Sequence, residues 1–360
     1  MHLSMNWQDT LAMANLLLDS NSTQASASTR DPAAVSPWRL CVAPMMDWTD
    51  RHCRHFHRLL SPHARLYTEM VNAHAVRHGD RERLLGFDAS EHPVALQLGG
   101  SDPELLAQAA RIGQDWGYDE INLNCGCPSD RVQAGRFGAC LMREPSLVAD
   151  CVAAMHAVVS IPVTVKCRIG VDEQDDDAGL QQFIDVVHRA GCSVFIVHAR
   201  KAWLKGLSPK ENRDVPPLNY PRVHRLRQEF PGLTLVMNGG LTTVAASIEQ
   251  VAMLDGVMLG RAAYHEPWIL AELEQALFAP ESTLPDRFAM LDRMRDYTEA
   301  RLAKGDSLAQ ITRHVLGLYQ GLPGARKFRR VLSEQAHRKG SGWEVVETAL
   351  QSMKEFALAA

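Results

Sequence analysis

The stretch PVTVKCRIGVDEQDDDAGLQQFIDVVHRAGCSVFIVHAR, residues 162–200, contains one complete strand–helix–strand repeat. Its ends, Pro162–Arg168 and Val194–Arg200, are short apolar runs without strict alternation, which is typical of strands buried on both faces. Between them, Leu180–Ala190 follows the 3.6-residue period of an amphipathic helix and stops before Gly191. A strand, a crossover helix and a second strand predict a parallel sheet.

The same repeat extends in both directions along the chain. Eight runs predict strands, at Leu40–Pro44, Arg65–Val71, Pro93–Leu98, Glu120–Asn124, Pro162–Arg168, Val194–Arg200, Leu233–Asn238 and Gly256–Gly260. Helices are predicted at Asp102–Trp116, Pro145–Val159, Leu180–Ala190, Tyr220–Phe230 and Thr243–Leu254. Ser101, with Glu104 three residues later, has the spacing of a capping box and is the expected N-cap of the first of these helices.

Eight strand–helix units over roughly 240 residues have the size of a closed (β/α)₈ TIM barrel. A doubly wound open sheet is the alternative architecture for such a repeat. That fold binds dinucleotides at a Gly-x-Gly-x-x-Gly turn, and none of the predicted strands is followed by one. The number of units and the missing glycine motif both favour the α/β TIM barrel.

Segments outside the repeat define the expected domain organisation. Residues 1–37 are expected to be a disordered N-terminal extension, because Asn21–Ser36 is rich in Ser, Thr, Ala and Pro. Residues 38–275 form the predicted barrel domain. Helical patterns alone follow it, at Ala271–Phe278, Arg287–Lys304, Ile311–Gln320, Lys327–Arg338 and Glu344–Ala357, so residues 281–360 are expected to form a small all-helical C-terminal domain.

Composition narrows the class of protein. Hydrophobic residues make up 46% and charged residues 22% of the 360 residues, as in ordinary globular proteins, and the net charge of −4 shows no global basic excess. The eight cysteines contain no C-x-x-C pair, which argues against a disulfide framework and against a zinc site. The apolar run Leu16–Leu18 is too short for a signal sequence, so we expect a cytoplasmic protein.

Polar residues stand at nearly every predicted strand end, where a barrel of this class places its active site. They are Asp47, Glu69, Gln97, Asn124, Lys166, Arg168, His198, Asn238 and Arg261. Gly239–Gly240 and Gly260–Arg261 follow the last two strands, whose loops often bind phosphate because a ligand can approach the glycine backbone closely.

Lys166 lies within an otherwise apolar strand. It is either paired with a barrel carboxylate such as Glu69, or held beside an acceptor that becomes anionic during reaction, such as reduced flavin. His198 is either a core histidine or a ligand contact, and its position at a strand end favours the contact. Gln97 can offer a flavin ring both a donor and an acceptor.

Cys127 follows the fourth predicted strand in Asn-Cys-Gly-Cys-Pro, where Pro128 prevents further pairing. Its thiol is therefore expected on a loop over the rim, and Gly135 and Gly138 suit a mobile lid there. A free thiol is mostly protonated at neutral pH, so it can act as a general acid as well as a nucleophile. Taken in isolation, Cys127 is as well explained by an inert thiol. Cys125 shares this segment and is expected to point the other way or into the core.

Two basic clusters bear on a nucleic-acid substrate. Gln310–Lys339 carries seven Lys and Arg residues against the single acid Glu334. A second cluster follows the sixth strand and consists of Lys201, Lys205, Lys210 and Arg213. Each cluster alone can be a solvated face, but both together indicate a groove that follows a phosphate backbone.

Several motifs jointly resemble the tRNA-dihydrouridine synthase family. They are VAPMMDWTDRHCR (42–54), ALQLGG (95–100), INLNCGCPSDR (121–131), RFGACLM (136–142), VKCRIG (165–170) and HARKAWL (198–204). SPKENR (208–213) and TRHVLGL (312–318) resemble the bacterial A subgroup specifically. The resemblance runs from about residue 40 to residue 340 and therefore includes both expected domains.

The resemblance implies FMN in the barrel, NADPH as a transient electron donor, and uridines 20 and 20a of the tRNA D-loop as substrate. It implies that Cys127 is the catalytic proton donor and that Asn124 contacts the target uracil. The implied flavin contacts are Pro44, Met45, Met46, Gln97, Lys166 and His198, and the implied phosphate site is Asn238, Gly239, Gly240, Gly260 and Arg261. The implied tRNA-binding residues are Lys210, Arg213, Arg326 and Arg329, which makes residues 281–360 a tRNA-binding domain. Neither a metal, a membrane nor a protein partner is implied.

Two departures and two alternatives accompany this interpretation. Cys125 stands where the family usually has an aliphatic residue, and Ala134 where the subgroup often has Asn, but neither change removes a catalytic group. An FMN-dependent oxidoreductase that acts on a free pyrimidine is one alternative function. An RNA-binding protein that has lost catalysis is the other.

Overall fold

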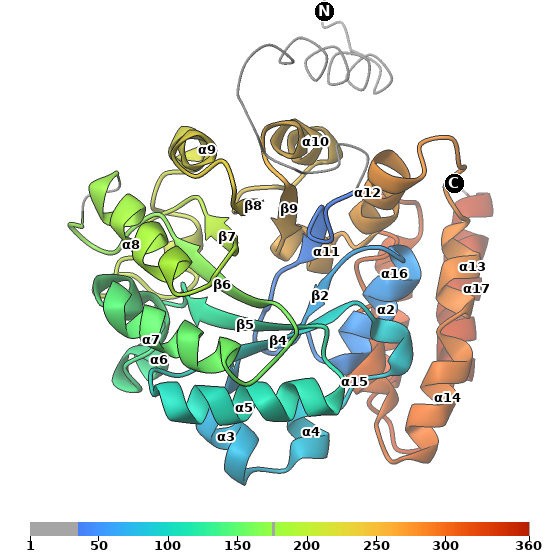
Figure 1. Ribbon diagram of the computed structural model, residues 1–360. Helices are drawn as coiled ribbons and strands as arrows, with labels where there is room; N and C mark the ends of the chain where they lie inside the picture. The colour runs from blue at the N-terminus through green and yellow to red at the C-terminus, as the bar shows by residue number, and fades with distance from the viewer. Residues whose placement is uncertain (1–34, 175–176, 360) are drawn as a thin grey trace, which may run out of the picture. The chain divides into compact units, whose positions relative to one another are not determined.

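A computed structural model describes residues 35–174 and 177–359 (Figure 1). Of the extension expected over residues 1–37, the part up to residue 34 lies outside the described residues. Nine parallel strands are described, namely β1 (Leu40–Val42), β2 (Leu66–Tyr67), β3 (Val71–Asn72), β4 (Val94–Gly99), β5 (Glu120–Cys125), β6 (Val163–Arg168), β7 (Val194–His198), β8 (Thr234–Asn238) and β9 (Gly256–Leu259). All eight predicted strands are confirmed, the second one divided into β2 and β3.

The strands close into a barrel. Their order in the sheet is β1-β9-β8-β7-β6-β5-β4-β2, with β3 also paired to β4, and every pairing is parallel. Closure is made next to β2, where the Val42 N–H donates to the Arg65 carbonyl and the Arg65 N–H donates to the Leu40 carbonyl, both at 2.9 Å. The predicted (β/α)₈ TIM barrel is therefore confirmed.

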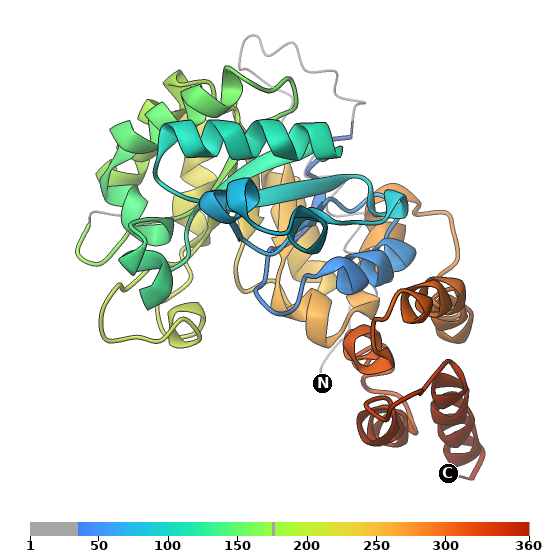
Figure 2. The ribbon, with the colours of Figure 1, turned by 90° about the horizontal axis from the view of Figure 1, so that it is seen from below.

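Helices follow the strands as expected. Those between β3 and β9 are α3 (Ala73–His78), α4 (Arg81–Leu85), α5 (Pro103–Trp116), α6 (Asp130–Ala134), α7 (Pro145–His156), α8 (Ala178–Arg189), α9 (Tyr220–Glu229) and α10 (Val244–Met253). Figures 1 and 2 show α5, α7 and α8 along the outside of the strands. The prediction that Ser101 is the N-cap of α5 was wrong. The Asp102 side chain accepts the Leu105 N–H at 2.9 Å, because Pro103 takes the first helical position and sets the cap one residue later.

The chain divides into two compact units. The first consists of residues up to Met45, Arg65–Phe87 and His92–Gly260, and it contains the strands. The second consists of Met46–Ala64, Asp88–Glu91 and residues from Arg261 onward. The two units are defined by contacts between residues, and each contains segments that are separate in the sequence. The domain boundaries 38–275 and 281–360, which follow the order of the chain, therefore remain a proposal.

The second unit is helical. It contains α2 (Arg51–Leu60), α11 (Arg261–His265), α12 (Trp268–Phe278), α13 (Arg287–Asp292), α14 (Arg295–Ala303), α15 (Leu308–Thr312), α16 (Ala325–Gln335) and α17 (Glu344–Ala359). The helix predicted at Arg287–Lys304 is two helices, because the chain tightens where the Met294 N–H bonds to the Leu291 carbonyl. The helix predicted at Ile311–Gln320 ends at Thr312. A side chain at Gly317 would collide with the His265 backbone. The turns after α15 therefore bring the backbone at Gly317 close to the backbone at His265.

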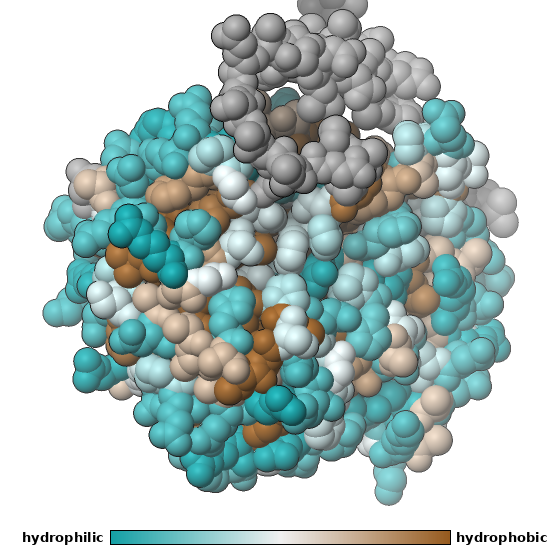
Figure 3. All heavy atoms as spheres, in the orientation of Figure 1, coloured by the Kyte–Doolittle hydropathy of each residue, from teal (hydrophilic) through white to brown (hydrophobic). Residues whose placement is uncertain are grey.

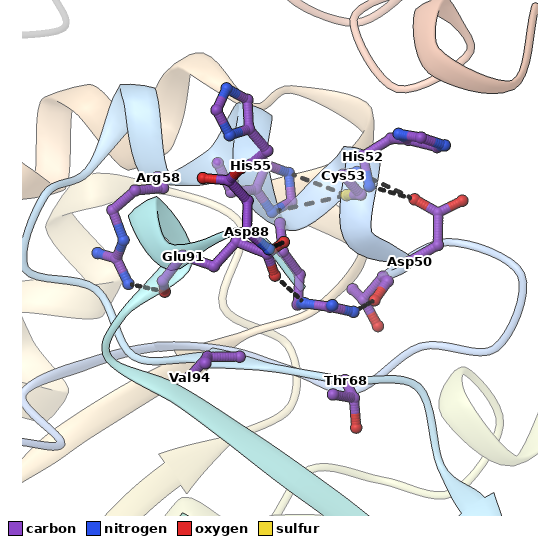
Figure 4. A network of polar contacts seen from close by, with 12 residues as sticks. Asp50, His52, Cys53, His55, Arg58, Thr68, Asp88, Glu91 and Val94 are labelled. Carbon is purple, nitrogen blue, oxygen red and sulfur yellow. Dashed lines mark hydrogen bonds and ion pairs between the residues drawn. The ribbon is translucent and has the colours of Figure 1, made fainter. Parts of the chain in front are cut away.

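Helix α2 is held by buried polar contacts in the second unit, as Figure 4 shows. The Asp50 side chain caps the helix by accepting the N–H groups of His52 and Cys53, both at 3.0 Å. The Arg54 Nε donates to Glu91 at 2.6 Å, and Arg58 donates to the Glu91 carbonyl at 3.0 Å. These bonds connect the segment Asp88–Glu91 to α2.

Surface character agrees with a globular protein. Most residues on the face in Figure 3 are hydrophilic, with smaller apolar areas between them. Within residues 35–174 and 177–359, no helix combines the length and the apolar composition that a bilayer span requires.

Candidate active site at the strand ends

The inside of the barrel has an apolar part and a polar part. The apolar cluster comes mainly from β1, β2, β7, β8 and β9, and contains Cys41, Ala43, Tyr67, Ala95, Ile196, Val236 and Met258. Polar side chains come from the three neighbouring strands β4, β5 and β6, where Gln97 lies opposite Asn122 and Asn122 lies opposite Thr164. Because side chains of a strand alternate between its faces, residues two apart on β5 and on β6 point the same way.

Asn124 positions the loop of Cys127. Its side-chain Oδ1 accepts the N–H groups of Gly126 at 3.1 Å and of Cys127 at 3.0 Å. Its Nδ2 donates to Gln97 Oε1 at 2.8 Å. The residue that we expected to contact uracil therefore also fixes the turn that carries the thiol, and it is directly connected to an expected flavin contact.

Cys127 is half-buried, and its loop packs closely on the following segment. The Cys127 carbonyl accepts the Ala139 N–H at 2.9 Å. Gly138 has φ 80°, and a Cβ there would collide with Val132 and lie 2.5 Å from the Cys127 carbonyl oxygen. Only glycine fits this approach. Cys125 is fully buried, as expected, and burial raises the pKa of its thiol well above the usual range.

Lys166 is held by an amide. Its Nζ donates to Asn238 Oδ1 at 3.0 Å, and Asn238 Nδ2 donates to the Met258 carbonyl at 2.7 Å. Among the described residues this amide, and not the carboxylate of Glu69, is the hydrogen-bond partner of Lys166. Burial, and then the nearby charge of Arg168, lower the pKa of Lys166 to about 8. An ammonium without a carboxylate partner is suited to an anionic ligand.

His198 lies in a cationic environment at the end of β7. Burial lowers its pKa well below the usual value, and the charges of Arg168, Lys166, Arg200 and Arg213 act in the same direction. The imidazole is therefore neutral at pH 7 and can both donate and accept a hydrogen bond. Four cations around one neutral ring make this end of the barrel favourable for a negatively charged group.

The expected phosphate residues fit such a group. Gly239 and Gly240 have φ 103° and 71°, and side chains there would collide with the His198 ring and with Leu218, respectively. At Gly260 a Cβ would find its nearest neighbours, Ala43 and Met45, only at 3.8 Å, so that backbone is openly approachable. The backbone at Gly239 and Gly240 is crowded, the backbone at Gly260 is open, and several cations lie nearby. This combination is typical of an anion-binding site.

The remaining expected flavin contacts lie at the ends of β1 and β9. Pro44 and Met45 are half-buried at the end of β1 in the first unit. Met46 is 54% exposed, and it and Arg261, the first residue of α11, belong to the second unit.

Sequence reasoning missed the role of Arg168. This side chain is 3% exposed, and its Nε donates to the Gly126 carbonyl at 2.9 Å. Its Nη1 donates to the carbonyls of Lys201 at 2.9 Å and Asn212 at 2.8 Å. Arg168 thus connects the Cys127 loop with the segment that follows β7. The available signal was an arginine two residues after Lys166, on the same face of the strand.

The segment after β7 carries two of the expected RNA contacts. Asn212 is fully buried and donates to the Trp203 carbonyl at 2.8 Å, which orders the segment from inside. Lys210 and Arg213 are exposed on it. Gln133 adds a second connection to the Cys127 loop, because its Nε2 donates to the carbonyls of Pro128 at 2.8 Å and Leu204 at 2.9 Å.

The other expected RNA contacts lie on α16 in the second unit. Arg326 is exposed, and Arg329 is half-buried and donates to Gln320 at 2.7 Å. Phe328 and Leu332 are buried on the opposite side of the helix. The helix therefore buries an apolar stripe and leaves its basic residues available.

Comparison with known proteins identifies the family of the chain. Residues 41–354 match the family described as dihydrouridine synthase (Dus). A tRNA-dihydrouridine(20/20a) synthase of Xanthomonas campestris pv. campestris is 66% identical over 322 residues, which cover 89% of this chain and 95% of the relative. Proteins of the same name from Xanthomonas axonopodis pv. citri and Vibrio cholerae are 65% and 57% identical over 87% of the chain, and the matches cover 93% and 95% of those relatives. The chain therefore belongs to the dihydrouridine synthase family.

Proposed function

We propose that this protein reduces the C5–C6 bond of uridine to dihydrouridine in the D-loop of tRNA, at positions 20 and 20a, with FMN as hydride donor and NADPH as reductant. The observation that carries the proposal is the cationic strand-end site, in which Asn238 holds Lys166, Asn124 holds the Cys127 loop, and the neutral His198 lies in the field of Lys166 and three arginines. Membership of the dihydrouridine synthase family and the names of the relatives support tRNA as the substrate.

The site has the residues to hold FMN. The glycine backbone at Gly239, Gly240 and Gly260, with Arg261, would bind the phosphate. Gln97, Lys166 and His198 would contact the ring, and Pro44, Met45 and Met46 would cover it. Reduced FMN, when bound, supplies the hydride for C6 of the base. Lys166 stabilises negative charge on its ligand because its ammonium has no carboxylate partner among the described residues.

Cys127 supplies the proton in this proposal. Addition of a hydride at C6 leaves negative charge on C5 and O4, and a protonated thiol can donate to C5 as a general acid. Asn124 and Arg168 hold the thiol loop from two sides, through the Cys127 N–H and the Gly126 carbonyl. The target base has to leave its stack to reach the thiol, since its C5–C6 bond is inaccessible within an RNA helix or loop stack.

Two basic surfaces would bind the RNA. Lys210 and Arg213 in the first unit and Arg326 and Arg329 in the second are at least partly accessible cations suited to phosphate contacts. A small free pyrimidine does not require such surfaces, and this favours tRNA over a free substrate.

One experiment tests the function. The purified protein is loaded with FMN, reduced with NADPH, and mixed under anaerobic conditions with unmodified tRNA or with free uridine. We expect tRNA to reoxidise the flavin and to gain dihydrouridine at positions 20 and 20a, and free uridine to react far more slowly. Equal reaction with free uridine would favour the free-pyrimidine oxidoreductase. A protein that binds tRNA but neither FMN nor NADPH would favour the non-catalytic RNA-binding alternative.

A further inference from the structure

A chain of side-chain hydrogen bonds runs through the polar part of the barrel, from Glu120 to the Cys127 loop. Its four links are Thr164 Oγ1 to Glu120 Oε1 at 2.6 Å, Asn122 Nδ2 to Thr164 Oγ1 at 2.7 Å, Gln97 Nε2 to Asn122 Oδ1 at 2.7 Å, and Asn124 Nδ2 to Gln97 Oε1 at 2.8 Å. Asn124 Oδ1 then accepts the N–H groups of Gly126 and Cys127. All five side chains in the links are at most 8% exposed, so water does not compete for these bonds.

The two ends of the chain determine the direction of every link. The backbone N–H groups of Gly126 and Cys127 can only donate, so Asn124 must turn its oxygen toward them and its nitrogen toward Gln97. At the other end, the ionised carboxylate of Glu120 can only accept, so the Thr164 hydroxyl must donate to it. One assignment of the amides of Gln97 and Asn122 satisfies both ends, and it is the one found here.

The carboxylate end is held by groups that cannot reverse. Trp38 Nε1 donates to Glu120 Oε2 at 2.7 Å, and Arg65 Nη1 lies 3.2 Å from the same oxygen. Both groups are donors only, and the buried charge of Arg65 requires a counter-charge. The Tyr67 hydroxyl donates to Glu120 Oε1 at 2.8 Å. Burial raises the pKa of Glu120, and Arg65 and the three hydrogen-bond donors oppose this.

We propose that Glu120 is a positioning residue for the active site, acting through this chain on Gln97, Asn124 and the Cys127 loop. Glu120 precedes Asn124 by four residues on one strand, so it lies about 13 Å from the site and does not touch the ligands. With the chain in place, Gln97 keeps one Nε2–H and one Oε1 lone pair available in fixed directions. Asn124 likewise keeps its oxygen committed to the turn of the thiol. The effect on catalysis rests on the proposed function, but the orientation of the amides does not.

The variant Glu120→Gln tests the direction of the chain. If the new amide oxygen accepts from Trp38 and Arg65, its NH₂ group faces the hydroxyls of Tyr67 and Thr164. Thr164 can then only accept from this group. Either its hydroxyl turns to donate to Asn122, and the reversal continues along the chain until it meets the fixed N–H donors of the Cys127 turn, or it accepts from Asn122 as well and its own O–H group loses its acceptor. In the opposite orientation the amide oxygen accepts from Thr164 and Tyr67, and the NH₂ group faces the donors of Trp38 and Arg65. Every arrangement therefore leaves at least one polar group of the network without its present partner.

Two further variants separate positioning from stability. Thr164→Val removes the hydroxyl that joins Glu120 to Asn122 and leaves the contacts of Glu120 with Arg65, Trp38 and Tyr67 intact. Tyr67→Phe is the matched control, because it removes one donor to Glu120 but no link of the chain. Thermal unfolding of all three variants establishes that each protein is folded.

The readouts are the side-chain NH₂ resonances of Gln97, Asn122 and Asn124 by ¹⁵N NMR, the dissociation constant of FMN, and kcat and KM on tRNA. In Glu120→Gln and Thr164→Val we expect shifted Gln97 and Asn124 resonances and an FMN affinity at least about tenfold lower, the equivalent of losing one buried hydrogen bond. We expect a reduced kcat in both, and Tyr67→Phe within about twofold of the unaltered protein in every readout.

Resonances of Gln97 and Asn124 that move no more in these two variants than in Tyr67→Phe, with equal FMN affinities, would overturn the proposal. Should Glu120→Gln fail to fold, Thr164→Val decides the matter alone. Failure of the unaltered protein to bind FMN or to reduce tRNA would refute the proposed function instead, and the NMR arm would still decide whether the chain orients the amides.

Discussion

The strand ends of the barrel and the helix α16 use cationic side chains in different ways. At the strand ends, Lys166 and Arg168 are largely buried, each has defined hydrogen-bond acceptors, and burial lowers the pKa of Lys166 to about 8 and that of Arg168 to about 10. On α16, Arg326 is exposed and Arg330 lies 3.9 Å from Glu334 on the surface. We therefore expect each buried cation to act on its ligand through its fixed position. The exposed cations are expected to act together through their summed charge.

Energetics explain this difference. A buried polar group that loses its partner costs about 1–3 kcal/mol, because no water replaces the bond. An exposed ion pair contributes only about 0–1 kcal/mol and is screened by salt. Substitutions at the strand ends should thus have larger effects than substitutions on α16, and the following predictions test that order.

Cys127→Ala should have the largest effect. Loss of a general acid at the reacting carbon is expected to lower kcat by about 10²–10⁴-fold, while the affinities for FMN and tRNA stay within about twofold. Single-turnover reduction of tRNA by the reduced enzyme measures the chemical step. The half-buried Cys140 offers a matched control, since Cys140→Ala should retain turnover. Unchanged turnover in Cys127→Ala would exclude it as the proton donor.

Arg168→Met should come second. It leaves the carbonyls of Gly126, Lys201 and Asn212 without their donor, which should reduce the free energy of unfolding by about 3 kcal/mol. Turnover should fall more than FMN affinity, because the loop of the thiol loses one of its connections. Denaturant unfolding and kcat measurements check both parts. Wild-type stability together with normal kcat would show that the three carbonyls find other donors.

Lys166→Met should have a smaller effect that depends on pH. Loss of a charged hydrogen bond should weaken FMN binding by about 10- to 100-fold. In the apoprotein the pKa of Lys166 is about 8 in the folded state, against an ordinary value of 10.5. Between these values the unfolded state binds more protons, so Lys166 makes the free energy of unfolding rise with pH from about 8 to 10.5. This contribution should be absent from Lys166→Met, and identical pH profiles of the two apoproteins would contradict the lowered pKa.

The pair Arg326→Ala and Arg329→Ala should have the smallest effect. Loss of the two proposed phosphate contacts is expected to change tRNA affinity by about tenfold or less near physiological salt, and to reduce the slope of log K against log salt by roughly 1.5. Turnover at saturating tRNA should remain normal. Binding isotherms at several salt concentrations make the measurement. An unaltered slope would remove α16 from the RNA-binding surface.

The sequence predicts the frame of the site better than its internal contacts. Apolar runs with polar ends predicted the eight strands and placed Gln97, Asn124, Lys166 and His198 at one rim, because periodicity depends on near neighbours. The hydrogen-bond partner of Lys166 was harder to predict from the sequence. Asn238 is 72 residues away, and choosing it over Glu69 requires knowledge of the packing inside the barrel.

The missed features share that cause. The role of Arg168 depends on carbonyls from two loops, 42 residues before it and 33 and 44 residues after it, which no local pattern indicates. The amide chain likewise depends on which residues of β4, β5 and β6 lie opposite one another. Local signals were also insufficient at helix ends, where Pro103 decided the cap of α5 and the close approach at Gly317 ended α15 early.

The closure of the barrel next to β2 has a consequence for its motions. Neighbouring strands from β4 to β8 face each other over four or five residue pairs, whereas β1 meets the segment before β2 through the two backbone bonds of Arg65. This is the shortest strand-to-strand contact of the described barrel. Amide hydrogen–deuterium exchange should therefore be fastest there and slowest in β5–β7. Local opening at this contact would separate β1 from the segment before β2, while the polar strands β4–β6 keep their register.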